Sequence, residues 1–367
     1  MDNPRTITDL PFEVLDLIFT ELLYLRYKVD LALTHEKLGK AFAFHSRNEF
    51  RTLKPSTALT GESWAFIVKE CGTSIEELFY DVRGIYWNDL IAQTVVKHCP
   101  NLKSVSTRLY RGQDISFQSF LKQMKNSLIS VTVKQENSFP LEILKVVGEM
   151  TQLKHLSLKI FADENVNQIH NCVGLETLEL EHHYYMRKHS VNLLRICAPL
   201  KNLRDLSVTN IKIPPLEDSN SNIWVSMETL ALILCEFSEL PDCPQLKWLR
   251  IYNPICHIEN YGLKFILKNG RNLKTLHEDC NPPIGPDGFL QVLRSCPKLR
   301  GFYTPMEYIK LYSGYVSAIL EILKENGVTR EDPLELVICR RIKWKWFRRL
   351  LLRAPNAELI DLYESAD

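Results

Sequence analysis

The chain has 367 residues, enough for two or three domains of ordinary size. A hydrophobic content of 45% with 24% charged residues is that of a folded globular protein and excludes a disordered chain. The 45 basic residues nearly balance the 44 acidic residues, so no overall field attracts a polyanion. We therefore expect protein partners, with no nucleic acid and no membrane.

The first ten residues, MDNPRTITDL, contain Asp2 and Asp9 and lack the basic segment and apolar stretch of a secretory signal. Apolar runs elsewhere, such as residues 230–235, are far shorter than the roughly 20 residues that span a bilayer. The ten cysteines include no Cys-x-x-Cys pair. They predict free thiols and a cytoplasmic or nuclear protein without disulfides.

Residues 7–50 are the first predicted element, a small helical module. Pro11 and Glu13 indicate a helix start, because proline needs no amide donor there and a carboxylate meets the positive end of the helix dipole. Two neighbouring apolar stripes follow with helical spacing: Val14, Ile18 and Leu22, and Leu15, Phe19 and Leu23. One stripe is enough for the core of so small a module, so the second predicts contact with another chain. The alternative is a module that only caps the following repeats.

A six-residue pattern (apolar, x, x, apolar, x, apolar or small) recurs from residue 75 to the end. The clearest copies begin at Leu153, Leu175, Leu203, Met227 and Leu246. Seven weaker copies begin at Ile75, Leu102, Leu128, Leu273, Leu299, Pro333 and Leu359. Between residues 75 and 299 the copies start 19 to 28 residues apart, which is the period of leucine-rich repeats.

Each copy predicts a short parallel strand with inward apolar side chains, followed by a helix on the opposite side. Apolar residues at helical spacing in 261–268 and 288–295 agree with this. Cys-Pro pairs at 99–100, 243–244 and 296–297 precede strands, where proline ends a helix and the cysteine is a small buried residue. The predicted fold class is an α/β solenoid, a leucine-rich-repeat horseshoe with parallel strands inside and helices outside, after a small all-α module.

The basic and aromatic segment 340–353 predicts one more repeat helix. As a helix it places these apolar side chains on one face: Ile342, Trp346, Phe347, Leu350 and Leu351. The opposite face carries Arg341, Lys345, Arg348 and Arg349. We expect the apolar face to dock on the neighbouring repeat, and the alternative is a helix that binds membrane or nucleic acid.

No motif for nucleotide or nucleophile chemistry occurs: G-x-G-x-x-G, G-x-x-x-x-G-K-[ST] and G-x-S-x-G are all absent from the sequence. His182, His183 and His189, with Cys172, lack the paired spacing of metal ligands and predict exposed loop histidines instead. We predict that the chain is not an enzyme and has no catalytic residue, metal or cofactor.

The segment Leu10-Pro11-x-Glu13-Val14-Leu15-x-x-Ile18-Phe19 resembles the start of the F-box, and residues 30–34 onward fit its later helices. An F-box followed by leucine-rich repeats with Cys-Pro before the strand is the arrangement of F-box and leucine-rich-repeat proteins. The resemblance implies a substrate receptor of a Skp-cullin-F-box ubiquitin ligase, whose F-box binds a Skp-type adaptor carrying the cullin. The implied adaptor-binding residues are Leu10, Pro11, Val14, Leu15, Ile18, Phe19 and Leu22. The alternative is a leucine-rich-repeat scaffold or inhibitor without a ligase role.

The expected domains are 1–52 for the F-box, 53–72 for a connecting segment and 73–367 for about 12 repeats. Residues between the inward leucines should face the concave side of the sheet and bind the target protein. The candidates are Lys134, Lys159, Glu179, Glu181, Trp248, Arg250, Tyr252, His277 and Tyr303. Trp248, Arg250 and Tyr252 form the expected centre, because exposed Trp, Tyr and Arg most often carry interface energy. A strand alignment shifted by one residue would instead make Trp248 a packing residue.

Overall fold

The computed structural model describes residues 6–135, 143–161, 164–182, 189–215, 223–252, 254 and 260–365. The chain divides into two compact units, Met1–Cys172 and Val173–Asp367, here called unit 1 and unit 2. The division falls inside the repeats. The expected domain limits at 52 and 72 therefore stay predictions.

Unit 1 begins with a three-helix module made of α1 (Phe12–Glu21), α2 (Leu25–Ala32) and α3 (Glu36–His45). Phe19 of α1 packs on Phe42 of α3, with the ring centroids 5.9 Å apart. His45 ties the three helices together: its Nδ1 lies 2.7 Å from Asp16 Oδ1, and Lys28 Nζ lies 2.7 Å from its Nε2. Because a lysine ammonium can only donate, the Nδ1 of His45 carries the proton that is donated to Asp16.

The repeats of unit 1 alternate strands with helices. The strands are β1 (Thr52–Leu53), β2 (Glu77–Tyr80), β3 (Ser104–Leu109), β4 (Ser130–Gln135) and β5 (His155–Phe161). The helices are α4 (Gly61–Cys71), α5 (Asp89–His98), α6 (Asp114–Met124) and α7 (Ile143–Val147). β1 pairs in parallel with β2, so the sheet already begins at residue 52.

Unit 2 continues the same alternation. Its strands are β6 (Thr177–His182), β8 (Asp205–Thr209), β10 (Thr229–Ile233), β11 (Trp248–Tyr252), β12 (Thr275–Asp279), β13 (Gly301–Thr304), β14 (Leu334–Ile338) and β15 (Ile360–Glu364). Its helices are α8 (Leu193–Cys197), α9 (Tyr261–Asn269), α10 (Pro286–Ser295), α11 (Ser313–Glu325) and α12 (Arg341–Leu351). Two short strands, β7 (His189–Ser190) and β9 (Ile211–Lys212), form a separate pair.

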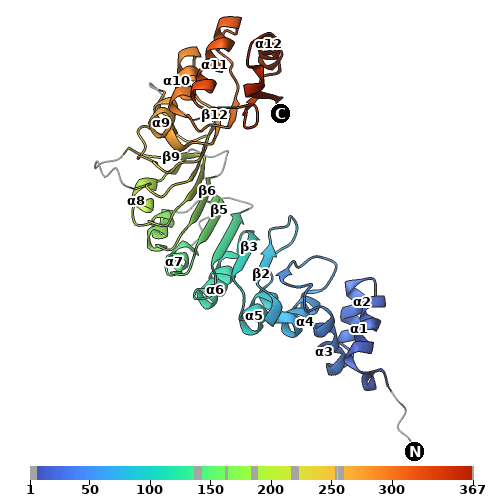
Figure 1. Ribbon diagram of the computed structural model, residues 1–367. Coiled ribbons are helices and arrows are strands. Elements are labelled where there is room, and N and C mark those ends of the chain that lie inside the picture. Colours follow the sequence, from blue (N-terminus) through green and yellow to red (C-terminus); the bar gives the residue numbers. More distant parts are fainter. Residues whose placement is uncertain are drawn as a thin grey trace, which may run out of the picture. The chain divides into compact units, whose positions relative to one another are not determined.

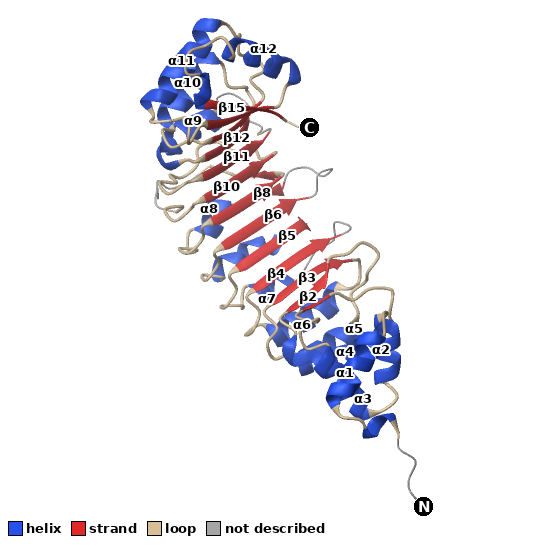
Figure 2. Cartoon of the chain, turned by 45° about the vertical axis from the view of Figure 1, so that its right-hand side comes forward, coloured by secondary structure: helices blue, strands red, loops and turns tan. Residues whose placement is uncertain are grey.

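Within the described ranges one sheet contains thirteen strands in the order β1-β2-β3-β4-β5-β6-β8-β10-β11-β12-β13-β14-β15. The assigned pairs are parallel, and each of the twelve predicted copies of the pattern contains one of these strands. Equivalent leucines stack in register, as Leu249 does beside Leu230 and Leu276. In each unit the repeat helices cover one face of the sheet (Figures 1 and 2). The predicted repeat architecture is thereby confirmed.

The three cysteines of the Cys-Pro pairs, Cys99, Cys243 and Cys296, are buried as predicted. Burial raises the pKa of the Cys99 and Cys296 thiols to about 12, so both stay protonated at neutral pH. They fill the core as small apolar side chains.

The docking face of α12 differs from the prediction. Phe347 and Leu351 are buried, but Ile342 is 72% exposed and Trp346 is 55% exposed. The helix has two apolar stripes, and it docks through the one that contains Phe347 and Leu351. Lys343 belongs to the docked side, where its Nζ donates to the carbonyl oxygen of Ile309 at 2.7 Å.

This orientation predicts opposite results for two adjacent aromatic residues. Phe347→Ala should lower the free energy of unfolding by about 3 to 5 kcal/mol, because it leaves a cavity in the core. Trp346→Ala should change it by less than about 0.5 kcal/mol, because the indole is mostly in water. Urea unfolding of both variants measures the difference, and equal losses would contradict the orientation of α12.

Candidate functional site

The open face of unit 2 is the face of its sheet that lies opposite the repeat helices. On β11, Leu249 and Ile251 are buried, so Trp248, Arg250 and Tyr252 point to the open face. Trp248 is half-buried and the other two side chains are exposed. A strand alignment shifted by one residue does not occur here.

Strand register brings five of the predicted target-binding residues together. Arg250 lies beside His277, and His277 lies beside Tyr303, in one row across β11, β12 and β13. The His277 and Tyr303 rings stack with centroids 3.7 Å apart and planes at 7°. The Trp248 ring lies 5.5 Å from His277, and the guanidinium of Arg250 lies 5.8 Å from the Tyr252 ring. These side chains form the aromatic row of the open face.

The electrostatics of the aromatic row favour a neutral imidazole. Burial, followed by the positive charge of Arg250, lowers the pKa of His277. Burial raises the pKa of the Tyr303 hydroxyl, and the hydrogen bond that this hydroxyl donates to Glu335 Oε1 at 3.0 Å acts in the same direction. The row is therefore uncharged apart from Arg250, and it suits apolar or aromatic groups of a partner.

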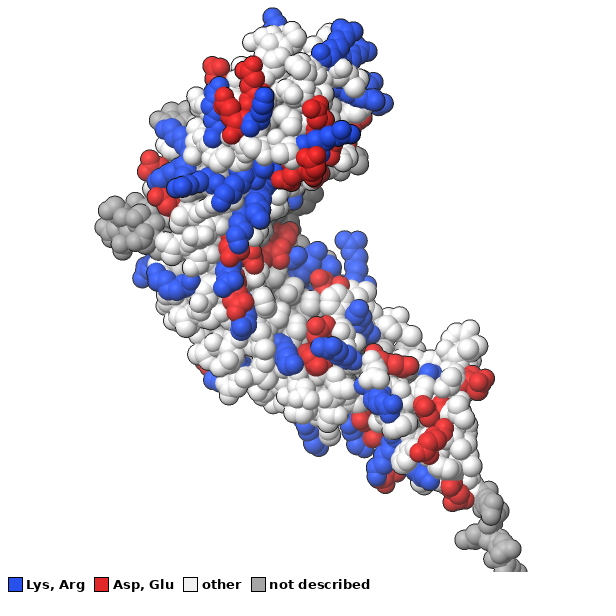
Figure 3. Space-filling model, viewed as in Figure 1, with Lys and Arg blue, Asp and Glu red and all other residues white. Residues whose placement is uncertain are grey.

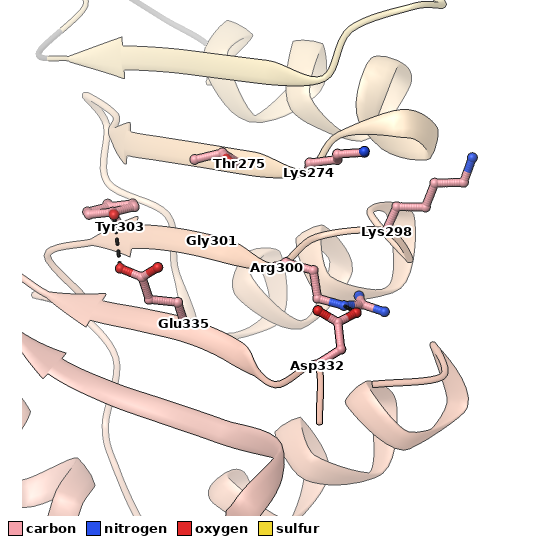
Figure 4. A pocket seen from close by; sticks show the side chains of 8 residues that line it. All are labelled: Lys274, Thr275, Lys298, Arg300, Gly301, Tyr303, Asp332 and Glu335. Atoms are coloured by element: carbon pink, nitrogen blue, oxygen red, sulfur yellow. Dashed lines mark hydrogen bonds and ion pairs between the residues drawn. The ribbon is translucent and has the colours of Figure 1, made fainter. Parts of the chain in front are cut away.

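A hollow of about 490 Å³ adjoins the aromatic row. Its lining residues are Lys274, Thr275, Lys298, Arg300, Gly301, Tyr303, Asp332 and Glu335 (Figure 4). Gly301 contributes no side chain to the row that Thr275 and Glu335 continue on the neighbouring strands. Of this set, only Tyr303 was among the predicted target-binding residues. The other seven were not predicted, because nothing in the local sequence shows that Gly301 leaves space between Thr275 and Glu335 on the neighbouring strands.

The remaining predicted target-binding residues lie farther along the sheet. Lys134 of β4 and Lys159 of β5 are in-register neighbours in unit 1. Glu179 and Glu181 lie on β6 of unit 2 and are half-buried. Glu179 is in the same row as Arg250, but the intervening strands β8 and β10 put it about 14 Å away. The structure does not gather these four with the aromatic row.

The predicted adaptor-binding residues divide into two groups. Leu15 and Phe19 are fully buried in the core of the helical module. The other five reach the surface: Val14 and Pro11 are exposed, and Leu10, Ile18 and Leu22 are half-buried. The stripe with Leu15 and Phe19 therefore forms the core, and the stripe with Val14 and Ile18 faces outward.

Further apolar side chains of this module, outside the predicted adaptor-binding residues, also reach the surface. The exposed ones are Ile7, Phe12, Leu17, Leu23, Tyr24, Tyr27, Leu33 and Phe44. Leu23 is 87% exposed, and Phe12 and Phe44 touch across α1 and α3 with ring centroids 6.3 Å apart. The sequence of α1 already indicated exposed apolar side chains, because apolar residues occur around most of the circumference of this helix. We call these side chains, together with Val14, the apolar surface of the module.

Of the histidines considered as metal ligands, His182 is not the exposed loop residue that was predicted. His182 ends β6 and is buried, because it occupies a strand position rather than a loop. Cys172 is buried as well, and burial raises its pKa to about 12. His183 and the side chain of His189 lie outside the described residues. In the part of the chain that is described, no three His, Cys, Asp or Glu residues are grouped as metal ligands, and no helix is long and apolar enough to cross a membrane.

Comparison with known proteins identifies the fold. An internalin, inlF, from Listeria monocytogenes is similar at a TM-score of 0.53 and 13% identity, over 99% of this chain and 100% of that one. The fold is a leucine-rich-repeat solenoid. Two further structures are similar at lower scores: the yeast Rad7 and Elc1 complex (TM-score 0.44, 13% identity, 89% and 88% covered) and the mouse RP105/MD-1 complex (0.42, 11%, 81% and 61%). No protein-family model and no curated protein sequence matches the chain.

Proposed function

We propose that this chain is a substrate receptor of a Skp-cullin-F-box ubiquitin ligase. The helical module would bind the Skp-type adaptor, which carries the cullin, and the open face of the repeats would bind a target protein. The observation that carries the proposal is the apolar surface of the module, spread over residues 7–44. Many exposed apolar side chains on a small module are typical of a protein interface.

The core of the module supports this assignment. Leu15, Phe19 and Phe42 are fully buried, and the His45 hydrogen bonds hold the three helices together. A module with a complete core of its own does not need the outward stripe for folding. The outward stripe is therefore free to meet a partner, and the resemblance to the start of the F-box at Leu10 and Pro11 names the kind of partner.

The mechanism of such a receptor is proximity. A target on the repeats and an adaptor on the module belong to one assembly, which raises the local concentration of the target near the conjugating enzyme. In this proposal the chain itself makes and breaks no bond, needs no cofactor, and works in the cytoplasm or the nucleus.

A scaffold without a ligase role is the second candidate, and one contact favours it. Phe42 of the module packs against Phe66 of α4, with ring centroids 6.2 Å apart, and Gly39 lies next to the same ring. The module thus also caps the first repeat helix. Co-expression with a Skp-type adaptor separates the candidates, because a receptor co-elutes with the adaptor and a scaffold elutes alone.

The aromatic row predicts the effect of two substitutions on target capture. Trp248→Ala and Arg250→Ala should each reduce proximity labelling of the target severalfold, because both remove contact groups of the types that dominate interfaces. Neither should lower the free energy of unfolding by more than about 1 kcal/mol, since both side chains reach solvent. Tyr308→Ala, which removes an exposed aromatic outside the row, is the matched control. A loss of several kcal/mol from Trp248→Ala would show that this residue belongs to the core.

A further inference from the structure

Basic residues stand side by side at the start of three neighbouring strands of unit 2. Lys247, Lys274 and Arg300 immediately precede β11, β12 and β13. The Lys274 amide donates to the Lys247 carbonyl at 2.7 Å, and the Arg300 amide donates to the Lys274 carbonyl at 2.8 Å. Strands are about 4.8 Å apart, which is shorter than the screening length of about 8 Å at physiological salt. Like charges so placed destabilise the sheet unless anions compensate them.

The compensation within the chain is incomplete. Lys247 Nζ pairs with Glu228 at 2.6 Å, and Arg300 Nε pairs with Asp332 at 2.6 Å. Lys298 Nζ donates to the neutral Asn272 Oδ1 at 2.8 Å. Among the described residues the ammonium of Lys274 has no acidic partner. Lys274 and Lys298 both line the hollow at Gly301, so two cations that lack carboxylates border an open space (Figure 4).

The two sides of the hollow differ in chemistry. One side carries Lys274 and Lys298, and Figure 3 shows Lys and Arg side chains gathered near α9 with acidic side chains beside them. The other side carries the Tyr303 ring, which stacks on His277. A ligand that satisfies both sides has an anionic group next to an apolar or aromatic group.

We propose that the hollow at Gly301 binds an acidic segment of the target protein. An Asp or Glu carboxylate of that segment pairs with Lys274 and Lys298, and a neighbouring apolar side chain packs on the aromatic row. This inference rests on the proposed function, because it assumes that the bound segment belongs to the target protein. It adds the chemical class of the segment and the residues that recognise it.

The charges around the hollow favour a carboxylate over more highly charged ligands. Asp332 and Glu335 line the same hollow, so a phosphoryl dianion or a nucleic-acid strand would lie close to two carboxylates. A single carboxylate meets less repulsion there. Exposed ion pairs contribute only about 0.2 to 1 kcal/mol each, so the binding is weak and sensitive to salt.

Fluorescence anisotropy with the full chain tests the site. The probe is a short fluorescein-labelled peptide rich in Glu with a single Phe, and its counterpart has Gln in place of Glu. We expect the Glu peptide to bind about tenfold more tightly than the Gln peptide at low salt. Lys274→Glu should weaken Glu-peptide binding about tenfold. Gly301→Ala should also weaken it, because the new methyl group lies in the floor of the hollow, 3.3 Å from Thr275 Cγ2.

Lys268→Glu is the matched control, since it makes the same charge change on α9 at a lysine paired with Asp242. Equal weakening by the Lys274 and Lys268 variants would overturn the proposal, because the peptide would then respond only to overall charge. Equal binding of both peptides would overturn it too, as would tighter binding of a phosphoserine peptide or a single-stranded oligonucleotide. Adaptor co-elution is measured on the unsubstituted chain as well: failure to bind the Glu peptide with the adaptor retained would refute the site alone, and peptide binding without the adaptor would refute the ligase role alone.

Discussion

Leu10→Ala combined with Pro11→Ala should abolish co-purification of the Skp-type adaptor. Leu10 is half-buried and Pro11 exposed at the start of α1, so the double variant removes contact area without opening the core. The helical module should stay folded, because Leu15 and Phe19 keep their packing. Pull-down of tagged chain from cells that co-express the adaptor measures the effect, and circular dichroism checks the fold.

Two control variants make this result specific. Leu352→Ala removes an exposed leucine far along the sequence and should leave adaptor recovery unchanged. Leu15→Ala should lower stability by about 2 to 5 kcal/mol, because it cuts a cavity in the module, and should lose the adaptor only through unfolding. Full recovery of the adaptor with the Leu10 and Pro11 variant would refute the receptor and leave the scaffold as the function.

Stability of unit 2 should fall as pH rises from about 4.5 to about 8, because of one buried acid. Glu278 occupies on β12 the inward position that Ile251 holds on β11. Its carboxyl accepts hydrogen bonds from the Thr304 hydroxyl and, at 3.3 Å, from the Cys280 amide. Burial nevertheless raises its pKa from the usual 4.5 to about 8.

The sign of the effect follows from which state holds the proton. In the unfolded chain Glu278 loses its proton near pH 4.5, whereas in the fold it keeps the proton up to about pH 8. The folded state therefore binds more protons within that window, and its stability falls by about 1 kcal/mol per pH unit. The total loss across the window is several kcal/mol.

The comparison with Glu278→Gln isolates this contribution. A glutamine amide can accept from the Cys280 amide with its oxygen and offer an N–H to the Thr304 hydroxyl, which can act as donor or acceptor, but it does not titrate. The difference in urea midpoint between wild type and variant should therefore grow steadily from pH 5 to pH 8. Glu228→Gln is the control, because the hydrogen bond from Lys247 lowers the Glu228 pKa and confines its effect to pH below about 4.5. Parallel profiles of wild type and Glu278→Gln would refute a protonated Glu278.

The sequence by itself determined the repeat architecture. A short strand in each repeat needs inward apolar side chains at fixed spacing, and the anchors at Leu175, Leu203 and Leu246 display that spacing without any knowledge of contacts. The same alternation predicted correctly that Trp248 and Arg250 face outward. The two apolar stripes of α1 likewise indicated that one of them would be left outside the core.

Only the tertiary structure decided which of several equivalent faces is used. Both stripes of α1 and both stripes of α12 are apolar, and their hydrophobicity alone does not tell which one docks, so Trp346 was misplaced. The hollow at Gly301 and the row of basic residues Lys247, Lys274 and Arg300 arise from side chains that are about 26 residues apart in sequence and become neighbours through strand register. Local sequence carries periodicity, whereas the choice of face and the pairing of charges depend on what the neighbouring repeats place opposite each side chain.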